Sequence, residues 1–413
     1  MRVLVIAQYF PPRRSTFSSR WAWLATFLAE RGHTIEVVAF LSTARQFGNL
    51  QHAFESDPPP PGVVFHPVLP VLRGQGLATR AVADVLAAMR GFRQAMAVKD
   101  VDVVVASAPS LVLAPLGWLV ARAQGKPFVL DLRDAWPELM DDWREWNDDG
   151  QGPRPLHPVK KAMFPVAKYV VAGLIHTLRL KADAVVVTTE RLALRLRSQG
   201  AKRVETVRNT SSKEWPYALR RVPLQQDELR VLYMGNVGRA QLLATAIRAA
   251  AHAKRSGINI TFRIVGGGPQ LDAAKKIARL EDAPVEFVDR VPTYEVLDHY
   301  RWADTVLVML RDWEAMKDTV PSKLYEALLT GRHITASVAG EAADLVNHYS
   351  AGDVVPPEDV DALAALWSIL ATDRSCLHVP LGGRHWVRKH LTPEDLSHTF
   401  ENVLTEVVEG REA

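Results

Sequence analysis

In the C-terminal third of the chain, a short stretch combines residue types that suit the binding of a phosphorylated ribose. Pro321 and Ser322 open a predicted helix that Gly331 ends, and Lys323 and Glu326 fall in its first turns. Backbone N–H groups and the positive end of the helix dipole attract an anion, and Lys323 adds a point charge for phosphate. Glu326 would accept two hydrogen bonds from a vicinal diol. An ordinary capped helix with a surface lysine and glutamate is the alternative.

Two glycine-containing loops follow predicted strands in the same half of the chain. Gly235–Arg239 follows the strand Leu229–Met234, and Gly266–Pro269 follows Asn259–Val265. Glycine allows the backbone to approach a ligand closely and to adopt positive φ. A guanidinium at Arg239 can grip a diphosphate through two parallel hydrogen bonds. A merely tight turn and a solvent-exposed arginine are the alternatives.

Length and composition narrow the class of protein. At 413 residues the chain is too long for one ordinary domain, so we expect two. A hydrophobic content of 48% and a charged content of 23% fit a soluble globular enzyme. The single cysteine, Cys376, excludes an internal disulfide framework and fits a reducing compartment. No Cys/His cluster has metal-site spacing, so we expect no metal.

The N-terminus and the charge distribution bear on location. Met1–Ala7 reads as a first strand, too short for a signal-peptide core, and no apolar run reaches the roughly 18 residues of a membrane span. Residues 1–210 hold 27 lysines and arginines against 18 aspartates and glutamates, whereas the remainder is acidic. A basic first half would suit an anionic partner, such as a membrane surface or a phosphorylated substrate. A plain solvated basic face is the alternative.

Strand and helix signals alternate along the whole chain, which predicts an α/β fold with parallel, doubly wound sheets. Continuous apolar runs suit strands buried on both faces. The predicted strands of the first half are Arg2–Gln8, Thr34–Phe40, Val63–Pro67, Val101–Ala106, Phe128–Leu132, Ala184–Thr188 and Val204–Val207. Those of the second half are Leu229–Met234, Asn259–Val265, Val285–Val288, Thr305–Met309 and His333–Ala336, with a helix over Ala240–Ser256.

Prolines and polar residues near Lys213–Glu228 place a domain boundary there. We therefore expect an N-terminal domain over residues 1–212, a C-terminal domain over 213–380 and terminal helices over 381–413 that pack back on the first domain. Ligands of such sheets bind beyond the carboxyl ends of the strands, so two facing domains predict a cleft between them.

Two further segments stand out. Asp141–Pro158 is rich in Asp, Trp, Gly and Pro and predicts a long loop, either a lid or disordered. Val159–Lys181 predicts a helix with lysines beside bulky apolar residues. It would suit an anionic membrane surface, although a packing helix with snorkelling lysines is the more ordinary interpretation.

Taken together, these motifs resemble retaining glycosyltransferases of family four with the two-domain GT-B fold, over nearly the whole length. The closest resemblance is to the subgroup that builds bacterial envelope polysaccharides or glycosylated natural products. The motifs that carry it are Gln8–Pro12 with the helix from Arg20, Leu130–Glu138, Arg208-Asn209, Met234–Gln241, Ile264–Pro269, Arg290–Pro292 and Val320–Glu326.

The resemblance implies roles for individual residues. Arg239 and Lys323 would stabilise the departing diphosphate, with Arg133, Asp134 and Asp318 also on the catalytic side. The nucleotide and the donor sugar would lie against Gly238, Gly266, Gly267, Gly268, Arg290, Val291, Pro321, Ser322 and Glu326. The acceptor or its phosphates would lie near Arg13, Arg14, Ser18 and Arg20.

Several positions depart from the family pattern. Asp318 stands where a glutamate is usual, and Arg133 replaces the usual histidine before Asp134. The first loop lacks paired glycines. The usual lysine after Arg239 is absent, and Lys323 would compensate.

The resemblance implies transfer of a hexosyl or N-acetylhexosaminyl group from a nucleoside diphosphate sugar, with UDP expected, to a glycan, lipid-linked or small-molecule acceptor. It implies retention at the anomeric carbon, no cofactor and no nucleic-acid partner. A cytoplasmic protein with peripheral contact to the inner membrane face is expected. A catalytically degenerate nucleotide-binding partner subunit and a nucleotide-sugar epimerase are the alternatives.

Overall fold

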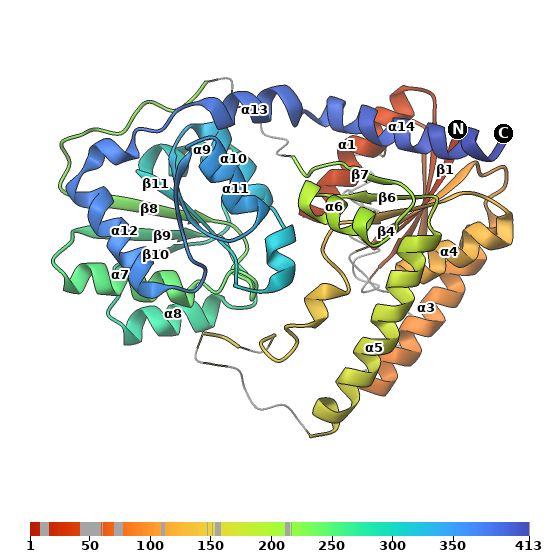
Figure 1. Ribbon diagram of the computed structural model, residues 1–413, viewed down its shortest axis with the longest axis horizontal. Helices are drawn as coiled ribbons and strands as arrows, with labels where there is room; N and C mark the ends of the chain where they lie inside the picture. The colour runs from red at the N-terminus through yellow and green to blue at the C-terminus, as the bar shows by residue number, and fades with distance from the viewer. Residues whose placement is uncertain are drawn as a thin grey trace. The chain divides into compact units, whose positions relative to one another are not determined.

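A computed structural model describes residues 1–8, 16–41, 59, 61–69, 77–108, 112–146, 148–150, 152, 158–210, 215 and 217–412. The chain forms two compact units, each built on its own parallel sheet (Figure 1). The first comprises Met1–Glu138, Phe164–Ser212 and Leu391–Ala413, and the second comprises Leu139–Met163 and Lys213–His390. The prediction of two doubly wound α/β domains is confirmed, whereas the cleft between them stays a prediction.

The sheet of the first unit has seven parallel strands in the order β3-β2-β1-β4-β5-β6-β7. Its strands are nearly uninterrupted runs of branched apolar residues, which suits burial on both faces. They span β1 Arg2–Ala7, β2 Thr34–Phe40, β3 Val63–Val68, β4 Val103–Ala108, β5 Phe128–Leu132, β6 Ala184–Val187 and β7 Val204–Thr206. The helices are α1 Thr16–Glu30, α3 Leu77–Ala97, α4 Leu113–Gln124, α5 Pro158–Lys181, α6 Glu190–Ser198 and α14 Pro393–Glu412.

The C-terminal helix α14 packs against α1 within the first unit. The buried ring of Phe400 meets Trp21 edge to face, with 5.7 Å between centroids. The next residue, Glu401, accepts hydrogen bonds from Arg31 at 2.8 Å and from His33 at 2.7 Å. The last 23 residues of the chain therefore belong to the same unit as its first strand.

The sheet of the second unit has six parallel strands in the order β10-β9-β8-β11-β12-β13. In Figure 1, α7 and α8 lie on the opposite side of this sheet from α9 and α10. The strands are β8 Leu229–Met234, β9 Ile260–Val265, β10 Val285–Val288, β11 Thr305–Met309, β12 His333–Ser337 and β13 Gly352–Val355. The helices are α7 Ala244–Arg255, α8 Leu271–Leu280, α9 Val296–Trp302, α10 Ser322–Thr330, α11 Glu341–His348, α12 Val360–Thr372 and α13 Gly382–His390, with short 3-10 turns η1 Glu138–Met140, η2 Thr293–Glu295, η3 Glu314–Asp318 and η4 Arg374–Leu377.

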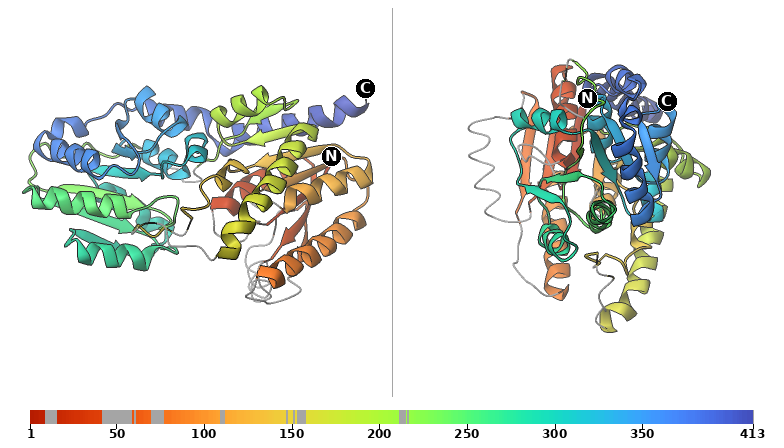
Figure 2. Two further views of the ribbon diagram at one scale, coloured as in Figure 1. Left: turned by 60° about the horizontal axis from the view of Figure 1, so that its bottom comes forward. Right: turned by 90° about the vertical axis from the view of Figure 1, so that its left-hand side faces the viewer.

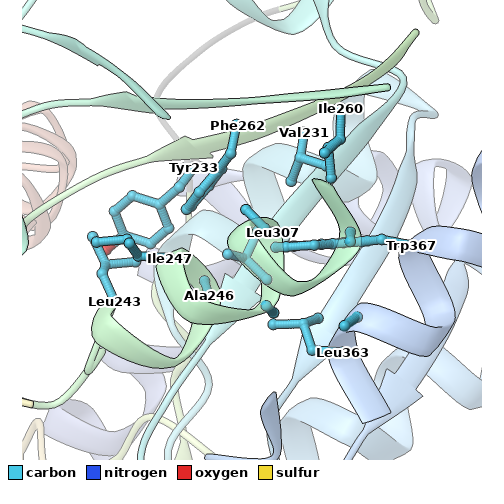
Figure 3. Packing of buried hydrophobic residues seen from close by; sticks show 14 of the residues in the cluster. Val231, Tyr233, Leu243, Ala246, Ile247, Ile260, Phe262, Leu307, Leu363 and Trp367 are labelled. Carbon is cyan, nitrogen blue, oxygen red and sulfur yellow. The ribbon is translucent and has the colours of Figure 1, made fainter. Parts of the chain in front are cut away.

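One large apolar core lies between this sheet and the helices α7, α8 and α12. Figure 3 shows Phe262 and Trp367 within it, and their ring centroids are 5.8 Å apart. Tyr233 and Leu243 belong to the same core and flank the loop that carries Arg239. The Tyr233 hydroxyl donates to the Asn236 carbonyl at 2.7 Å, so a side chain of the core fixes the backbone of this loop.

The domain boundaries predicted from the sequence need two adjustments. Leu139–Met163, assigned above to the first domain, belongs by its contacts to the second unit. Residues 381–390 also belong to the second unit, and only the chain from Leu391 onward joins the first. Among their described residues neither segment contains a strand, so no periodicity in the sequence indicates the sheet they accompany.

Most predicted strands agree with the structure to within two residues. The edge strand β13 was missed, because it is four residues long and only its last residue is buried. Helix α7 begins at Ala244 rather than Ala240, and α1 begins at Thr16 rather than Arg20. The end of α10 at Gly331 is confirmed, since this residue has φ 70° and its N–H bonds back to the Leu328 carbonyl.

Candidate functional site

At the carboxyl ends of β8 and β9, the two predicted glycine loops lie against each other. The Gly235 N–H donates to the Val265 carbonyl at 3.0 Å, and the Val237 N–H donates to the Gly267 carbonyl at 3.1 Å. The Gln270 N–H returns a bond to the Val237 carbonyl at 3.0 Å. These bonds extend the pairing of two central strands past the sheet, so the loops form one rigid surface where ligands of such sheets bind.

Two of the three consecutive glycines are required by this packing. A Cβ on Gly266, whose φ is 141°, would lie 2.0 Å from the Gly235 carbonyl oxygen. A Cβ on Gly268 would lie 2.4 Å from the Val237 carbonyl oxygen. At Gly267, by contrast, the nearest atom would be Nε of Arg290 at 3.6 Å. The middle glycine therefore has room for a Cβ, which would make an ordinary van der Waals contact with Arg290.

Arg239 lies in a turn between the end of β8 and the start of α7, with its side chain exposed. The Arg311 N–H donates to the neighbouring Ala240 carbonyl at 2.8 Å and fixes the turn. Within the described part of the chain, the Arg239 guanidinium makes no hydrogen bond or ion pair. Arg239 therefore presents an available cation from a fixed backbone turn. The sequence predicted a helix start directly after Arg239, but α7 begins five residues later, at Ala244.

The first turn of α10 brings Lys323 to the same surface. Pro321 has extended φ and ψ and precedes the helix, which starts at Ser322. A Cβ on Gly235 would lie 3.7 Å from Cγ of Lys323, so the lysine stem borders the first glycine loop. Its ammonium contacts both carboxylate oxygens of Glu326, at 3.0 and 3.1 Å. A phosphate at this helix start would meet backbone N–H groups and a lysine together.

The carboxylate of Glu326 is held from a second side by a residue that the sequence analysis missed. The Tyr300 hydroxyl donates to Glu326 Oε2 at 3.3 Å, and both side chains are buried. Burial, together with the negative charge of Glu326, raises the pKa of Tyr300 well above its ordinary value. Tyr300 therefore stays a donor that orients the glutamate. Nothing in the sequence links these residues, which lie 26 positions apart on α9 and α10.

The remaining residues predicted for the donor side occupy neighbouring loops of the second unit. Arg290 is exposed and Val291 half-buried, just after β10, and Arg290 reaches Gly267 as described above. Gly238 is closely packed, since a Cβ there would lie 2.5 Å from the Asn236 amide nitrogen. Asp318 ends η3 four residues before α10, and its side chain is buried.

In the first unit, the predicted residues follow the central strand β5. Asp131 is fully buried and accepts from Ser107 at 2.8 Å and from Arg20 at 3.2 Å. Arg20 also donates to the Val207 carbonyl at 2.8 Å, and only 1% of it is exposed. The prediction that Arg20 contacts an acceptor is not supported, because its guanidinium is buried and already paired. Its charge is used inside the unit, where it joins α1 to the ends of β5 and β7.

Arg133 and Asp134 stand directly after β5. Burial lowers the pKa of Arg133 to about 10, although Asp131 and Asp134 oppose this shift. Burial also raises the pKa of Asp134, against the charge of Arg133. The loop that follows is fixed by Arg179, which donates twice to Glu138 at 2.8 Å and to the Trp136 carbonyl. The pair is thus placed by rigid elements on both sides.

Three residues predicted on the acceptor side receive no structural account. Arg13 and Arg14 lie outside the described residues. Ser18 lies in α1, but its side chain is outside the described part.

Comparisons with known proteins identify the family of the chain. Residues 17–210 match the family described as "Glycosyl transferase 4-like domain", and residues 228–373 match "Glycosyl transferases group 1". The chain belongs to the group 1 glycosyltransferases of family four. Its two units are the two Rossmann-like domains of the GT-B fold.

Curated relatives of this glycosyltransferase act on mannosylated lipids. The chain is 32% identical over 145 residues to the GDP-mannose-dependent alpha-(1-6)-phosphatidylinositol monomannoside mannosyltransferase of Mycolicibacterium smegmatis. A Mycobacterium tuberculosis protein of the same name is 30% identical over 149 residues. These matches cover 34% and 35% of this chain and 38% of each relative, so the alignments span less than half the length of the curated relatives.

Solved glycosyltransferase structures match over almost the whole chain. A sucrose-phosphate synthase from Thermosynechococcus elongatus gives a TM-score of 0.68 at 15% identity, covering 99% of both chains. Anabaena Alr3699/HepE in complex with UDP gives a TM-score of 0.65 at 16% identity, covering 98% of this chain and 100% of that one. At such identities the likeness shows the fold alone.

Among the described residues, no three His, Cys, Asp or Glu side chains gather as metal ligands would. Likewise, none of the described helices is long and apolar enough to cross a membrane.

Proposed function

We propose that this glycosyltransferase moves a hexosyl group from a nucleoside diphosphate sugar, with retention at the anomeric carbon, to a lipid-linked acceptor. The observation that carries the donor half of this proposal is that the Arg239 turn, Lys323 and the start of α10 all lie at the carboxyl edge of the second sheet. Negative charge develops on the departing diphosphate in the transition state. Preorganised cations and N–H groups stabilise that charge more than they stabilise the intact donor.

Each part of the second unit then has a physical task. The two glycine loops would admit the diphosphate close to the backbone. Glu326, oriented by Tyr300, would accept hydrogen bonds from the ribose hydroxyls, and Lys323 would move from the carboxylate toward the phosphates. Arg290 and Val291 would lie beside the base. A transferred N-acetylhexosaminyl group fits the same chemistry, because these residues address the nucleotide and not the sugar.

The relatives divide on the base of the donor, since those named above are GDP-mannose-dependent and a structural neighbour binds UDP. A thermal-shift screen with UDP, GDP, TDP and their hexoses tests the donor. A ligand at 100 times its dissociation constant stabilises the folded protein by about 2.7 kcal/mol. We expect one base to raise the melting temperature and the others to leave it unchanged. Product formation from that donor, with the anomeric configuration read by NMR, tests the transfer; no shift with any base would reject the proposal.

A surface of α5 supports a lipid-linked acceptor. Val166, Tyr169, Val170 and Leu174 recur at helical spacing along one stripe and are exposed by 67, 82, 62 and 43%. The opposite face of α5, which includes the buried Ile175, packs as the ordinary interpretation of this helix predicted. The exposed apolar stripe is not explained by packing. The helix contains five lysines and arginines and no acidic residue. Figure 2 shows the part of the helix that belongs to the first unit, from Phe164 onward, on the outside of the sheet of that unit.

An apolar stripe on a wholly basic helix fits the surface of an anionic bilayer. We propose that α5 rests on such a surface, where a lipid-linked acceptor is presented. Replacing Val166, Tyr169 and Val170 together by serine should abolish co-sedimentation with phosphatidylglycerol vesicles. The control Leu280→Ser, at a residue 70% exposed in the second unit, should bind as the parent does. Equal binding of both variants, or equal binding of the parent to neutral phosphatidylcholine vesicles, would refute this role.

A further inference from the structure

The segment Leu139–Gly150 follows the first sheet in sequence but is attached to the second unit. Gly150 lies against the first residue of α7, where a Cβ would come within 2.3 Å of the Ala244 Cβ. Arg248, one turn into that helix, donates to the Gly150 carbonyl at 2.6 Å. Asp148 turns the chain here, because its Oδ1 accepts from the N–H groups of Gly150 and Gly152 at 2.8 and 2.9 Å. The sequence analysis predicted a lid or a disordered loop, and the described residues instead form a docked turn.

Arg311, which follows β11, is the centre of this attachment. Its Nη2 lies 3.1 Å from Asp148 Oδ2 and 3.1 Å from Glu145 Oε2, and its Nε donates to Glu358 Oε1 at 3.0 Å. Its Nη1 donates to the Glu145 carbonyl at 3.3 Å. Trp313 adds a hydrogen bond from its indole N–H to Glu145 at 2.8 Å. Only 3% of the Arg311 side chain is exposed.

The same arginine holds the turn that carries Arg239. Its backbone N–H donates to the Ala240 carbonyl at 2.8 Å, so main chain and side chain of one residue join the Arg239 turn to the docked segment. Asp148 and Asp149 line a small hollow together with Gly238 and Arg239. The docked segment therefore borders the predicted diphosphate site on its second-unit side.

Three carboxylates, those of Glu145, Asp148 and Glu358, surround the single guanidinium of this cluster. Burial alone would lower the pKa of Arg311, but the hydrogen bond and charge of Glu358, with the charges of Asp148 and Glu145, raise it. A buried ionic network stabilises a fold less than apolar packing of the same volume does. What this network supplies is geometry, because the planar guanidinium of Arg311 fixes the positions of the carboxylates that it pairs with.

We propose that Arg311 is a positioning residue, which with Glu145 and Asp148 fixes the turn that aims Arg239 at the diphosphate. The docked segment Leu139–Gly150 is thereby a working part of the donor site and not a lid over it. The inference rests on the proposed function, because it assigns Arg239 to the leaving group. A misplacement of about 1 Å at a group that stabilises the transition state costs up to roughly 100-fold in rate.

A double-mutant cycle on the full-length protein tests this role. Arg311→Lys keeps the charge but loses the forked geometry, and Asp148→Asn keeps the shape but weakens the pairing. We expect each to lower kcat by about 10- to 100-fold, with KM for the donor changed less than about 3-fold. In combination with Arg239→Ala, neither should lower kcat further, because a positioning residue acts only through the residue it positions. The control Arg301→Lys, an exposed arginine paired with Asp298, should leave kcat unchanged.

The outcomes separate this inference from the proposed function. Losses that multiply with Arg239→Ala, or variants as fast as the parent, would overturn the positioning role. Full turnover of Arg239→Ala itself would instead overturn the leaving-group assignment. Melting curves show whether Arg311→Lys is folded, and if it is not, Asp148→Asn carries the test alone.

Discussion

At the scale of single residues, the candidate donor site depends on contrasting environments of its charged groups. Glu326 is buried and oriented by Tyr300, so its carboxylate is fixed. Lys323 is half-buried and paired with Glu326, so a diphosphate would compete with that carboxylate for the ammonium. Arg239 is exposed on a fixed turn. We infer that Arg239 contributes most to catalysis and Glu326 most to binding of the nucleotide.

Replacement of Arg239 by alanine tests this division. Loss of one preorganised donor to the transition state lowers turnover by about two to three orders of magnitude, while the KM for the intact donor should change much less. Steady-state kinetics with the donor identified by thermal shift measure the effect. Arg255→Ala, at an arginine 59% exposed in the last turn of α7, is the matched control and should retain full turnover. Near-normal turnover of Arg239→Ala would remove this residue from the mechanism.

The glycines of the second loop give an internally controlled prediction. In Gly268→Ala the new Cβ would press on the Val237 carbonyl, so the two loops must separate. We expect Gly268→Ala to lose the nucleotide-induced thermal shift and to be destabilised by about 1–3 kcal/mol. Gly267→Ala, one position away, meets nothing closer than 3.6 Å and should fold as the parent does. Equal stability of the two variants would show that the loops are not packed as described.

At the scale of elements, ion pairs between distant segments hold each unit together. In the first unit, α14 is fastened to the start of the chain through Glu401, which accepts from Arg31 and His33. Burial opposes the charge of Glu401, but hydrogen bonds from Arg31 and His33 and their positive charges more than offset it and lower the pKa of Glu401. The helix therefore depends on an ionised carboxylate.

This dependence predicts a pH effect with a definite sign. A glutamate whose pKa is lower in the folded than in the unfolded chain contributes stability above the ordinary value of about 4.3, and this is lost as the pH falls through the folded value. Glu401→Gln should destabilise the first unit by about 1 kcal/mol at neutral pH. The difference from the parent should shrink as the pH falls below about 4.3 and vanish once the pH lies below the lowered pKa of Glu401 in the folded chain. Urea unfolding at several pH values measures it, with Glu409→Gln, an exposed residue of the same helix, as the control. A deficit that persists in acid would mean that Glu401 acts through packing.

At the scale of the whole molecule, each unit has its own sheet and its own core. A chain with two cores need not unfold as a single two-state system. We expect calorimetry to resolve two overlapping transitions, and a saturating donor nucleotide to move one of them upward by mass action. Hydrogen exchange should assign the shifted transition to strands β8 to β10. A nucleotide that protects β1 to β7 instead would place the donor on the wrong unit.

Strands and glycine loops were readable from the sequence because their signals are local. Apolar runs bounded by glycine or proline gave most strands, and Pro321 with Gly331 gave the ends of α10. The predicted residues that fall on loops after β8, β9 and β10 are adjacent because parallel strands bring their carboxyl ends to one edge. Arg20 shows the limit, since an arginine beside a polar loop looks the same in sequence whether it meets a ligand or a buried aspartate such as Asp131.

The amino-acid sequence by itself determined the two α/β domains, the order of their strands along the chain and the residue types available for a diphosphate and a ribose. Only the tertiary structure decided which long-range partners those residues have: Tyr300 for Glu326, Asp131 for Arg20, and the segment around Asp148 for Arg311. The physical reason is that periodicity and capping act over a few residues. A buried charge, in contrast, is paired by whatever segment the fold brings within hydrogen-bonding distance, however distant in sequence.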